Sequence, residues 1–196
     1  MREMMFIAIG IITSLIATYG KESIAGFGIA SRVEMFAMLV IGALSTIFAP
    51  ILGQNIGARK ATRVSEIIKE SEKFSLFYGL VVMIILFFTG EGIASIFTDN
   101  QEAINTISLY LKIIPLSYGI QGLFLIYTGA LNVLNRPVIS SLISLIRLFA
   151  LYIPLAVVGS KFFGLLGIWA ALVISFVIIT FVAKKILRTA LTDVLS

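Results

Sequence analysis

The chain has 196 residues, a formal net charge of +5 and a pI near 9.6; 59% of its residues are hydrophobic and 13% are charged. Soluble domains are about one quarter charged, so this composition, with a mean hydropathy of +1.08, indicates an integral membrane protein. The basic residues lie in short stretches between apolar segments and not along one amphipathic face, which argues against nucleic acid as a partner.

Apolar stretches predict six helices. A helix needs about 20 residues to cross a hydrocarbon core of roughly 30 Å, and the first stretch, 4–19, reaches only about 24 Å at about 1.5 Å per residue. Arg2 precedes it, as in a signal peptide, but 19–22 is a poor cleavage site. We therefore interpret 4–19 as a shortened spanning helix and expect the chain to be a piece of a longer protein. The other helices are expected near 24–50, 74–98, 107–133, 138–160 and 163–187.

Basic residues gather at alternate connections and give an orientation. They are Arg59, Lys60, Arg63, Lys69 and Lys73 after the second helix, Arg136 after the fourth, and Lys184, Lys185 and Arg188 after the sixth. Cytoplasmic connections carry the Lys and Arg excess. The pattern predicts that both termini and the connections at 54–73 and 134–137 are cytoplasmic, with 189–196 as a short tail.

The stretch APILGQNIGARKATR, residues 49–63, interrupts the apolar pattern with Pro and Gly and then turns basic. Glycines permit unusual backbone geometry, and side-chain amides can cap carbonyls freed where a helix ends. A helix terminus followed by a cytoplasmic loop accounts for the pattern. We assign the structural loop motif to Gly53, Gln54, Asn55, Gly57 and Ala58.

Two ionisable residues are expected deep in the membrane, where charge is costly and marks candidate functional positions. Glu34 lies about ten residues into the second helix, and Arg147 lies about nine residues into the fifth, at similar depth from the opposite side. Arg32 points away from Glu34 and can snorkel outward. Three interpretations are open: a structural Glu34–Arg147 ion pair, a Glu34 that binds a cation or proton with Arg147 stabilising its charged form, and a Glu34 that faces a water-filled cavity alone.

Polar residues also interrupt the fourth helix. Gln121 and Tyr118 are three residues apart and share a face, whereas Tyr127 lies well round the helix. Their amide and phenol groups could bind substrate or cation, or could serve as interhelical hydrogen bonds. Pro115 and Gly119 could kink or loosen this helix, and Pro154 could do the same in the fifth.

The residue inventory limits the chemistry. The sequence has no Cys and no His, so we expect no disulfide, no thiolate metal site and no imidazole proton carrier. It also lacks a phosphate-binding P-loop, a nucleophile elbow and a zinc-protease helix motif. We therefore predict a non-enzymatic protein with no cofactor and no bound metal beyond a coupling ion.

Four stretches resemble a known family: GKESIAGFGIASRVEMF, APILGQNIGARK, YGIQGLFLIYTGALNVLNRP and SLISLIRLFALYIPLA. They are similar to the C-terminal six-helix half of the multidrug and toxic compound extrusion family. The resemblance covers residues 5–188 and implies a twelve-helix transporter of two lobes in a prokaryotic inner membrane, of which 1–188 is the C-terminal lobe. The family's acidic cation sites do not carry over, because Glu3 aligns only approximately and 107–133 contains no Asp or Glu.

The resemblance predicts half of a secondary active antiporter that exports cationic or amphiphilic compounds in exchange for Na⁺ or H⁺. Its expected partners are an N-terminal six-helix lobe or a second copy of the chain, membrane lipids and cationic small molecules. The candidate site residues are Glu34, Arg147, Gln121 and Tyr118. The alternatives are a flippase for lipid-linked oligosaccharides from the same superfamily and a truncated fragment that does not transport.

Overall fold

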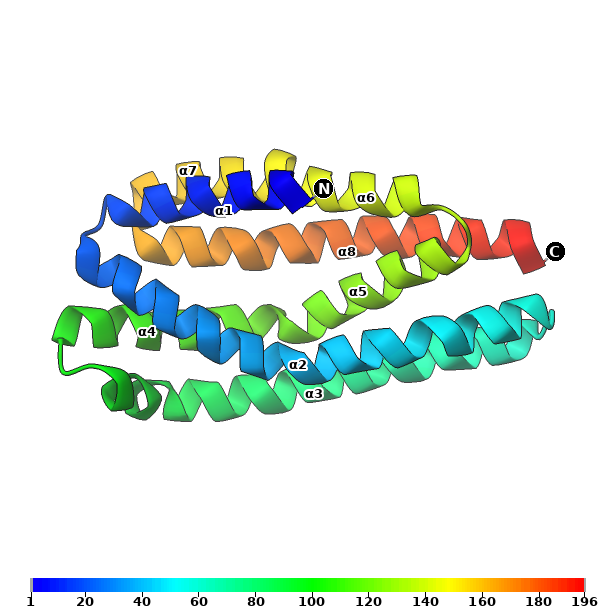
Figure 1. Ribbon diagram of the computed structural model, residues 1–196, viewed down its shortest axis with the longest axis horizontal. Helices are drawn as coiled ribbons and strands as arrows, with labels where there is room; N and C mark the ends of the chain where they lie inside the picture. The colour runs from blue at the N-terminus through cyan, green and yellow to red at the C-terminus, as the bar shows by residue number, and fades with distance from the viewer. Residues whose placement is uncertain (1, 196) are drawn as a thin grey trace.

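The computed structural model describes the backbone of residues 2–195 and the side chains of residue 4 and residues 6–194. All of its described regular elements are helical, and they form one elongated bundle (Figure 1). The prediction of an all-α bundle is confirmed. The elements are α1 (Arg2–Ala17), α2 (Lys21–Gly57), α3 (Ala61–Phe97), α4 (Gln101–Ile113), η1 (Ile114–Ser117), α5 (Tyr118–Val133), α6 (Pro137–Leu145), η2 (Ile146–Tyr152), α7 (Ile153–Phe163) and α8 (Leu165–Leu195).

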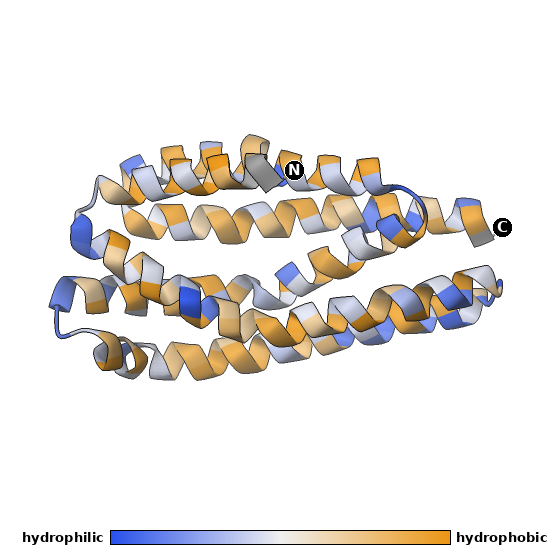
Figure 2. Ribbon diagram, in the orientation of Figure 1, coloured by the Kyte–Doolittle hydropathy of each residue, from blue (hydrophilic) through white to orange (hydrophobic). Residues whose placement is uncertain are grey.

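Five helical spans within residues 2–195 are long and apolar enough to cross a membrane. The continuous helices α2, α3 and α8 supply three of them, and the interrupted segments Gln101–Val133 and Pro137–Phe163 supply the other two. The apolar part of α1, Phe6–Ala17, is shorter. Hydrophobic colour follows the length of the bundle, and hydrophilic colour gathers toward its ends (Figure 2). This is the pattern of a multi-pass membrane protein.

The connection between α2 and α3 is shorter than the sequence suggested. We expected a loop at 54–73, but helix continues on both sides and only 58–60 lie between helices. The carbonyl groups at the end of α2 are satisfied by backbone donors, since Lys60 N donates to Asn55 O at 3.0 Å and Arg59 N donates to Ile56 O at 2.9 Å. This is a Schellman cap, with Arg59 in the left-handed conformation at φ 53°.

The expected loop motif is consequently a helical motif over most of its length. Gly53, Gln54 and Asn55 lie inside the last turns of α2. The Asn55 amide does not cap a freed carbonyl; its Nδ2 donates to Ile51 O at 2.9 Å, four residues earlier in the same helix. The sequence suggested an early end because Pro50 and the polar residues resemble a terminus, but Pro50 is accommodated within the helix.

The helix type changes at Pro115, one of the positions where the sequence allowed a kink. The 3₁₀ turn η1, with Pro115 in its first turn, separates α4 from α5. Just after it, α5 passes very close to α3: a Cβ atom built on Gly79 would lie 2.2 Å from the backbone nitrogen of Gly119. Only glycine at these positions permits such an approach of two backbones.

The fifth span also changes helix type before its proline. The seven residues of η2 form a π-helical segment that ends one residue before Ile153, and Pro154 follows. Proline cannot donate to the carbonyl four residues earlier and its ring crowds that carbonyl, which favours a local change in hydrogen-bond register. This segment carries Arg147, so it determines where that side chain points.

Candidate functional site

Glu34 lies on the face of α2 that packs against α4. Gly26 and Ala30, eight and four residues before it, are buried on the same helical face. A Cβ on Gly26 would lie 3.0 Å from the carbonyl oxygen of Ala103, so the two helices approach closely there. Both helices run in the same direction from neighbouring connections (Figure 1). Two turns further along each, Glu34 therefore faces Tyr110.

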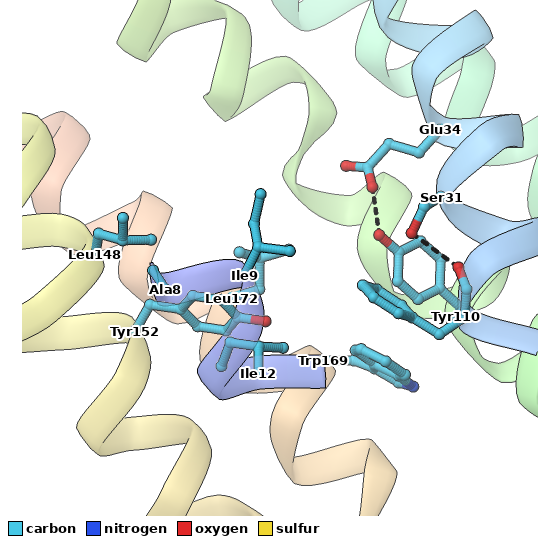
Figure 3. A pocket seen from close by; sticks show the side chains of 11 residues that line it. Ala8, Ile9, Ile12, Ser31, Glu34, Tyr110, Leu148, Tyr152, Trp169 and Leu172 are labelled. Atoms are coloured by element: carbon cyan, nitrogen blue, oxygen red, sulfur yellow. Dashed lines mark hydrogen bonds between the residues drawn. The ribbon is translucent and has the colours of Figure 1, made fainter. Parts of the chain in front are cut away.

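The hydroxyl of Tyr110 donates a hydrogen bond to Glu34 Oε2. Tyr110 is 2% exposed. Its ring packs edge-on against Trp169 with centroids 4.9 Å apart, and Phe27 stacks on Trp169 at 5.5 Å. The two partner rings hold the phenol in one orientation, and all three rings line the same cavity as the carboxylate (Figure 3). Glu34 is thus positioned by an aromatic cluster and by one charge-assisted hydrogen bond.

A cavity of about 150 Å³ lies beside this carboxylate. Its walls come from α1, α2, α4, η2 and α8. The lining residues are Ala8, Ile9, Ile12, Phe27, Ser31, Glu34, Tyr110, Leu148, Tyr152, Trp169 and Leu172. Ligand pockets for drug-sized molecules occupy about 300–1,000 Å³. In the described conformation the cavity therefore has room for an ion with water, or for part of a larger molecule.

Gln121 and Tyr118 reach the same region from the start of α5. Gln121 Nε2 donates to Ser117 Oγ at 2.9 Å, and the amide also lies close enough to Glu34 to interact with its carboxylate. Tyr118 is completely buried, and among the described residues its hydroxyl has no hydrogen-bond partner. An unpaired buried hydroxyl costs about 1–3 kcal/mol. A ligand that bonded to it would remove this cost.

Arg147 is not part of the Glu34 cluster. No ion pair joins Glu34 and Arg147 in the part of the chain that the structure describes. The Arg147 guanidinium lies over the ring of Phe176, 4.1 Å from its centroid, and 5.7 Å from that of Phe124. The hypothesis of a Glu34–Arg147 pair is wrong, because equal depth does not fix the direction of a side chain. Glu34 interacts with Tyr110 instead.

Tyr127 also lies away from Glu34, as its angular position on the helix predicted. Its hydroxyl donates to Glu72 Oε1 at 2.5 Å in a separate polar group. The sequence analysis did not identify Tyr110, Trp169 or Tyr152 as neighbours of Glu34. The Glu34–Tyr110 contact lies about two helical turns beyond the Gly26–Ala103 contact, but this relation is recognisable only after the pairing of α2 with α4 is known.

No group of three or more His, Cys, Asp or Glu residues that could hold a metal ion occurs among the described residues. A sodium ion at Glu34 would need further oxygen ligands from neutral groups, of which Gln121, Tyr110 and Ser31 are nearby. A proton would need only the carboxylate. Both ions fit the chemistry of this site.

The chain was compared with known proteins. Residues 4–158 match the model of the MatE family. The chain is 33% identical to the FAD transporter of Shewanella oneidensis over 169 residues, which are 86% of this chain and 37% of that protein. It is 28% identical to the multidrug export protein MepA of Staphylococcus aureus over 166 residues, 84% of this chain and 36% of that protein.

Among solved structures, the bent form of the Vibrio cholerae MATE transporter VcmN superimposes on the chain with a TM-score of 0.91. The two are 25% identical, and the match covers 96% of this chain and 43% of the Vibrio protein. The chain thus spans less than half the length of these relatives.

Proposed function

The chain belongs to the MatE family of transporters, and we propose that it forms one lobe of a secondary active exporter of cationic, amphiphilic compounds. Inward movement of Na⁺ or H⁺ drives the export. The second lobe is a six-helix N-terminal half or another copy of the chain, since relatives of this fold are more than twice as long. The lobe lies in the inner membrane of a prokaryote with its basic end in the cytoplasm.

The observation that carries the proposal is the Glu34 carboxylate beside the aromatic cavity. A carboxylate inside a membrane bundle is costly, so it persists where it exchanges a charge or pairs with one. Arg147, the cation that the sequence analysis placed at similar depth, lies over the rings of Phe176 and Phe124. Among the described residues Glu34 therefore has a hydrogen bond from Tyr110 but no ion-pair partner, and a transported cation or a proton supplies the missing positive charge.

The mechanism follows from the change in charge at Glu34. Binding of the coupling ion or proton neutralises the carboxylate, and binding of a cationic substrate requires that it be charged again. If the two occupied forms favour opposite arrangements of the lobes, each binding event shifts the population between inward-facing and outward-facing states. Substrate and coupling ion then use the same charge in alternation.

The aromatic rings fit a cationic substrate. Flat or quaternary cations bind over Trp, Tyr and Phe faces, and this site offers Trp169, Tyr110 and Phe27 within one cluster. The cavity of about 150 Å³ holds part of such a compound. The opposite lobe completes the binding chamber.

Transport of a flavin dinucleotide is a second candidate, favoured by the 33% identity to the Shewanella FAD transporter. An oligosaccharide flippase is disfavoured, because a diphosphate calls for cationic groups in the chamber and Arg147 is stacked on two rings. The two transport candidates make opposite predictions at Glu34. A carboxylate attracts an organic cation and repels an anionic dinucleotide.

The test is efflux from drug-sensitive bacteria. One strain expresses this chain alone, a second expresses it with the N-terminal lobe of a MatE-family relative, and two further strains carry Glu34→Gln or Glu91→Gln in the two-lobe pair. Glu91 is an exposed glutamate of α3 and serves as the matched control. Ethidium efflux and flavin release are measured after an imposed Na⁺ or pH gradient.

Exporter function predicts ethidium efflux in the two-lobe strain, a loss of about tenfold or more with Glu34→Gln, and no change with Glu91→Gln. The gradient that drives efflux identifies the coupling ion. Flavin release without ethidium efflux would favour the second candidate. Membrane insertion of both lobes without either activity would support a non-transporting fragment and contradict the proposal.

A further inference from the structure

A second cleft, of about 710 Å³, opens between α3 and α8 at the basic end of the bundle. The helix α5 packs against both α3 and α8 and forms the bottom of the cleft. Val64, Tyr127 and Leu187 are buried along it, whereas charged and hydroxyl side chains of α3 and α8 form its walls. This cleft shares no lining residue with the Glu34 cavity.

The inner end of the cleft is electrically neutral. Glu72 Oε1 accepts a hydrogen bond from the Tyr127 hydroxyl at 2.5 Å and lies 3.1 Å from Lys184 Nζ. The Lys184 ammonium is also 5.7 Å from the centre of the Tyr127 ring. The negative charge of Glu72 is therefore already compensated from the opposite wall.

One helical turn nearer the end of the bundle, both walls carry a cation. Lys69 precedes Glu72 by three residues on α3, and Arg188 follows Lys184 by four residues on α8, so both face the same cleft. Neither has a carboxylate within ion-pair distance in the described part of the chain. Three cations and one carboxylate line the cleft, which leaves two positive charges in excess.

The remaining described carboxylates at this end are occupied elsewhere. They form the pairs Glu66–Arg63 at 3.0 Å, Glu70–Lys73 at 2.6 Å and Asp193–Arg136 at 2.8 Å. The excess charge in the cleft is thus not cancelled by a neighbouring side chain. A further turn outward, Ser65 and Thr192 add a hydroxyl to each wall.

We propose that this cleft binds a phosphate-bearing anion between Lys69 and Arg188. A guanidinium on one wall and an ammonium on the other supply charge-assisted hydrogen bonds to phosphate oxygens. The Ser65 hydroxyl can donate to the same group, whereas Thr192 Oγ1 donates to Arg188 O at 3.1 Å. The volume suits a phosphorylated small molecule or a lipid headgroup. A phosphate at this depth lies where the basic end meets the membrane surface, and anionic lipids concentrate there.

The experiment uses the full chain in phosphatidylcholine nanodiscs. One arm titrates inorganic pyrophosphate and measures binding by calorimetry; the other measures, by native mass spectrometry, retention of phosphatidylglycerol against phosphatidylcholine. The test variant is Lys69→Gln with Arg188→Gln. The control is Lys60→Gln with Lys185→Gln. It also removes two positive charges, but from exposed residues outside the cleft.

We expect saturable binding by the unmodified chain in at least one arm, and the arm that responds identifies a soluble phosphate compound or a lipid headgroup as the ligand. The cleft variant should lose at least tenfold in affinity, and the control less than threefold. Circular dichroism and gel filtration establish that both variants are folded. Absence of saturable binding in both arms, or an equal loss in the two variants, would overturn the proposal.

Discussion

The crossing of α3 over α5 depends on the absence of a side chain at Gly79. A Cβ added there would lie 2.2 Å from Gly119 N and 2.5 Å from Gly119 Cα. Comfortable contacts between such atoms are about 3.5–4.0 Å, so the two backbones would have to separate by roughly 1.5 Å. Both nearest atoms belong to the backbone and cannot rotate away. Gly79→Ala therefore disrupts the contact that holds α3 against α5.

The expected change in the unfolding free energy of Gly79→Ala combines two opposing effects. Overpacking a close contact costs about 1–3 kcal/mol, whereas replacing Gly by Ala inside a helix gains up to about 1 kcal/mol. Gly92 lies in the same helix and is exposed, and a Cβ there would meet nothing within 4 Å. Gly92→Ala should thus keep only the favourable effect. Because the helix gain is common to both variants, they should differ by the overpacking cost, about 1–3 kcal/mol in unfolding free energy.

The assay is a reversible denaturation of the chain in mixed micelles by a denaturing detergent. The sequence contains a single Trp, and Trp169 is buried, so its fluorescence reports loss of the tertiary structure. Circular dichroism follows the helices separately. Equal stability of Gly79→Ala and Gly92→Ala would refute the close approach of the two backbones at this crossing.

Three further substitutions test individual contacts. Tyr110→Phe removes the hydroxyl that donates to Glu34; it should lower stability by about 1–3 kcal/mol and weaken cation-driven efflux, and unchanged values in both assays would contradict the contact. Arg59→Gly relieves a left-handed backbone conformation at φ 53° and should stabilise the chain by about 1 kcal/mol, whereas Arg59→Ala should give no such gain in the same denaturation. Arg147→Met keeps an apolar stem over Phe176 and should be tolerated within about 1.5 kcal/mol. In a double-mutant cycle with Glu34→Gln its effect should be additive, and coupling above about 0.5 kcal/mol would indicate an interaction between the two residues.

The resemblance of the sequence to a transporter family is confirmed by the family match and by the similarity to the Vibrio protein. The roles assigned to Glu34, Gln121 and Tyr118 stay predictions, and so does the choice of coupling ion. The positions of these residues nevertheless reduce the set of candidate partners for Glu34. Gln121 and Tyr118 lie with Glu34 in one region, and Arg147 does not.

The sequence by itself determined the membrane class and the number and order of the apolar helices, and it predicted the depth of Glu34. These properties depend on the transfer free energy of each residue and on the rise per residue of a helix, both of which are local. It also indicated Pro115 and Pro154 as positions where the helix could be perturbed, because a missing backbone donor acts wherever proline occurs.

Only the tertiary structure decided which groups meet at a given depth. The position of a side chain depends on its depth in the bundle and on the rotation of its helix about the helix axis. The rotation is set by packing against neighbouring helices. Gly26 brings α2 onto α4 and so places Glu34 against Tyr110, while η2 directs Arg147 toward Phe176. The cation expected to pair with the carboxylate was therefore replaced by a phenol, because helix rotation is determined by contacts between distant parts of the chain.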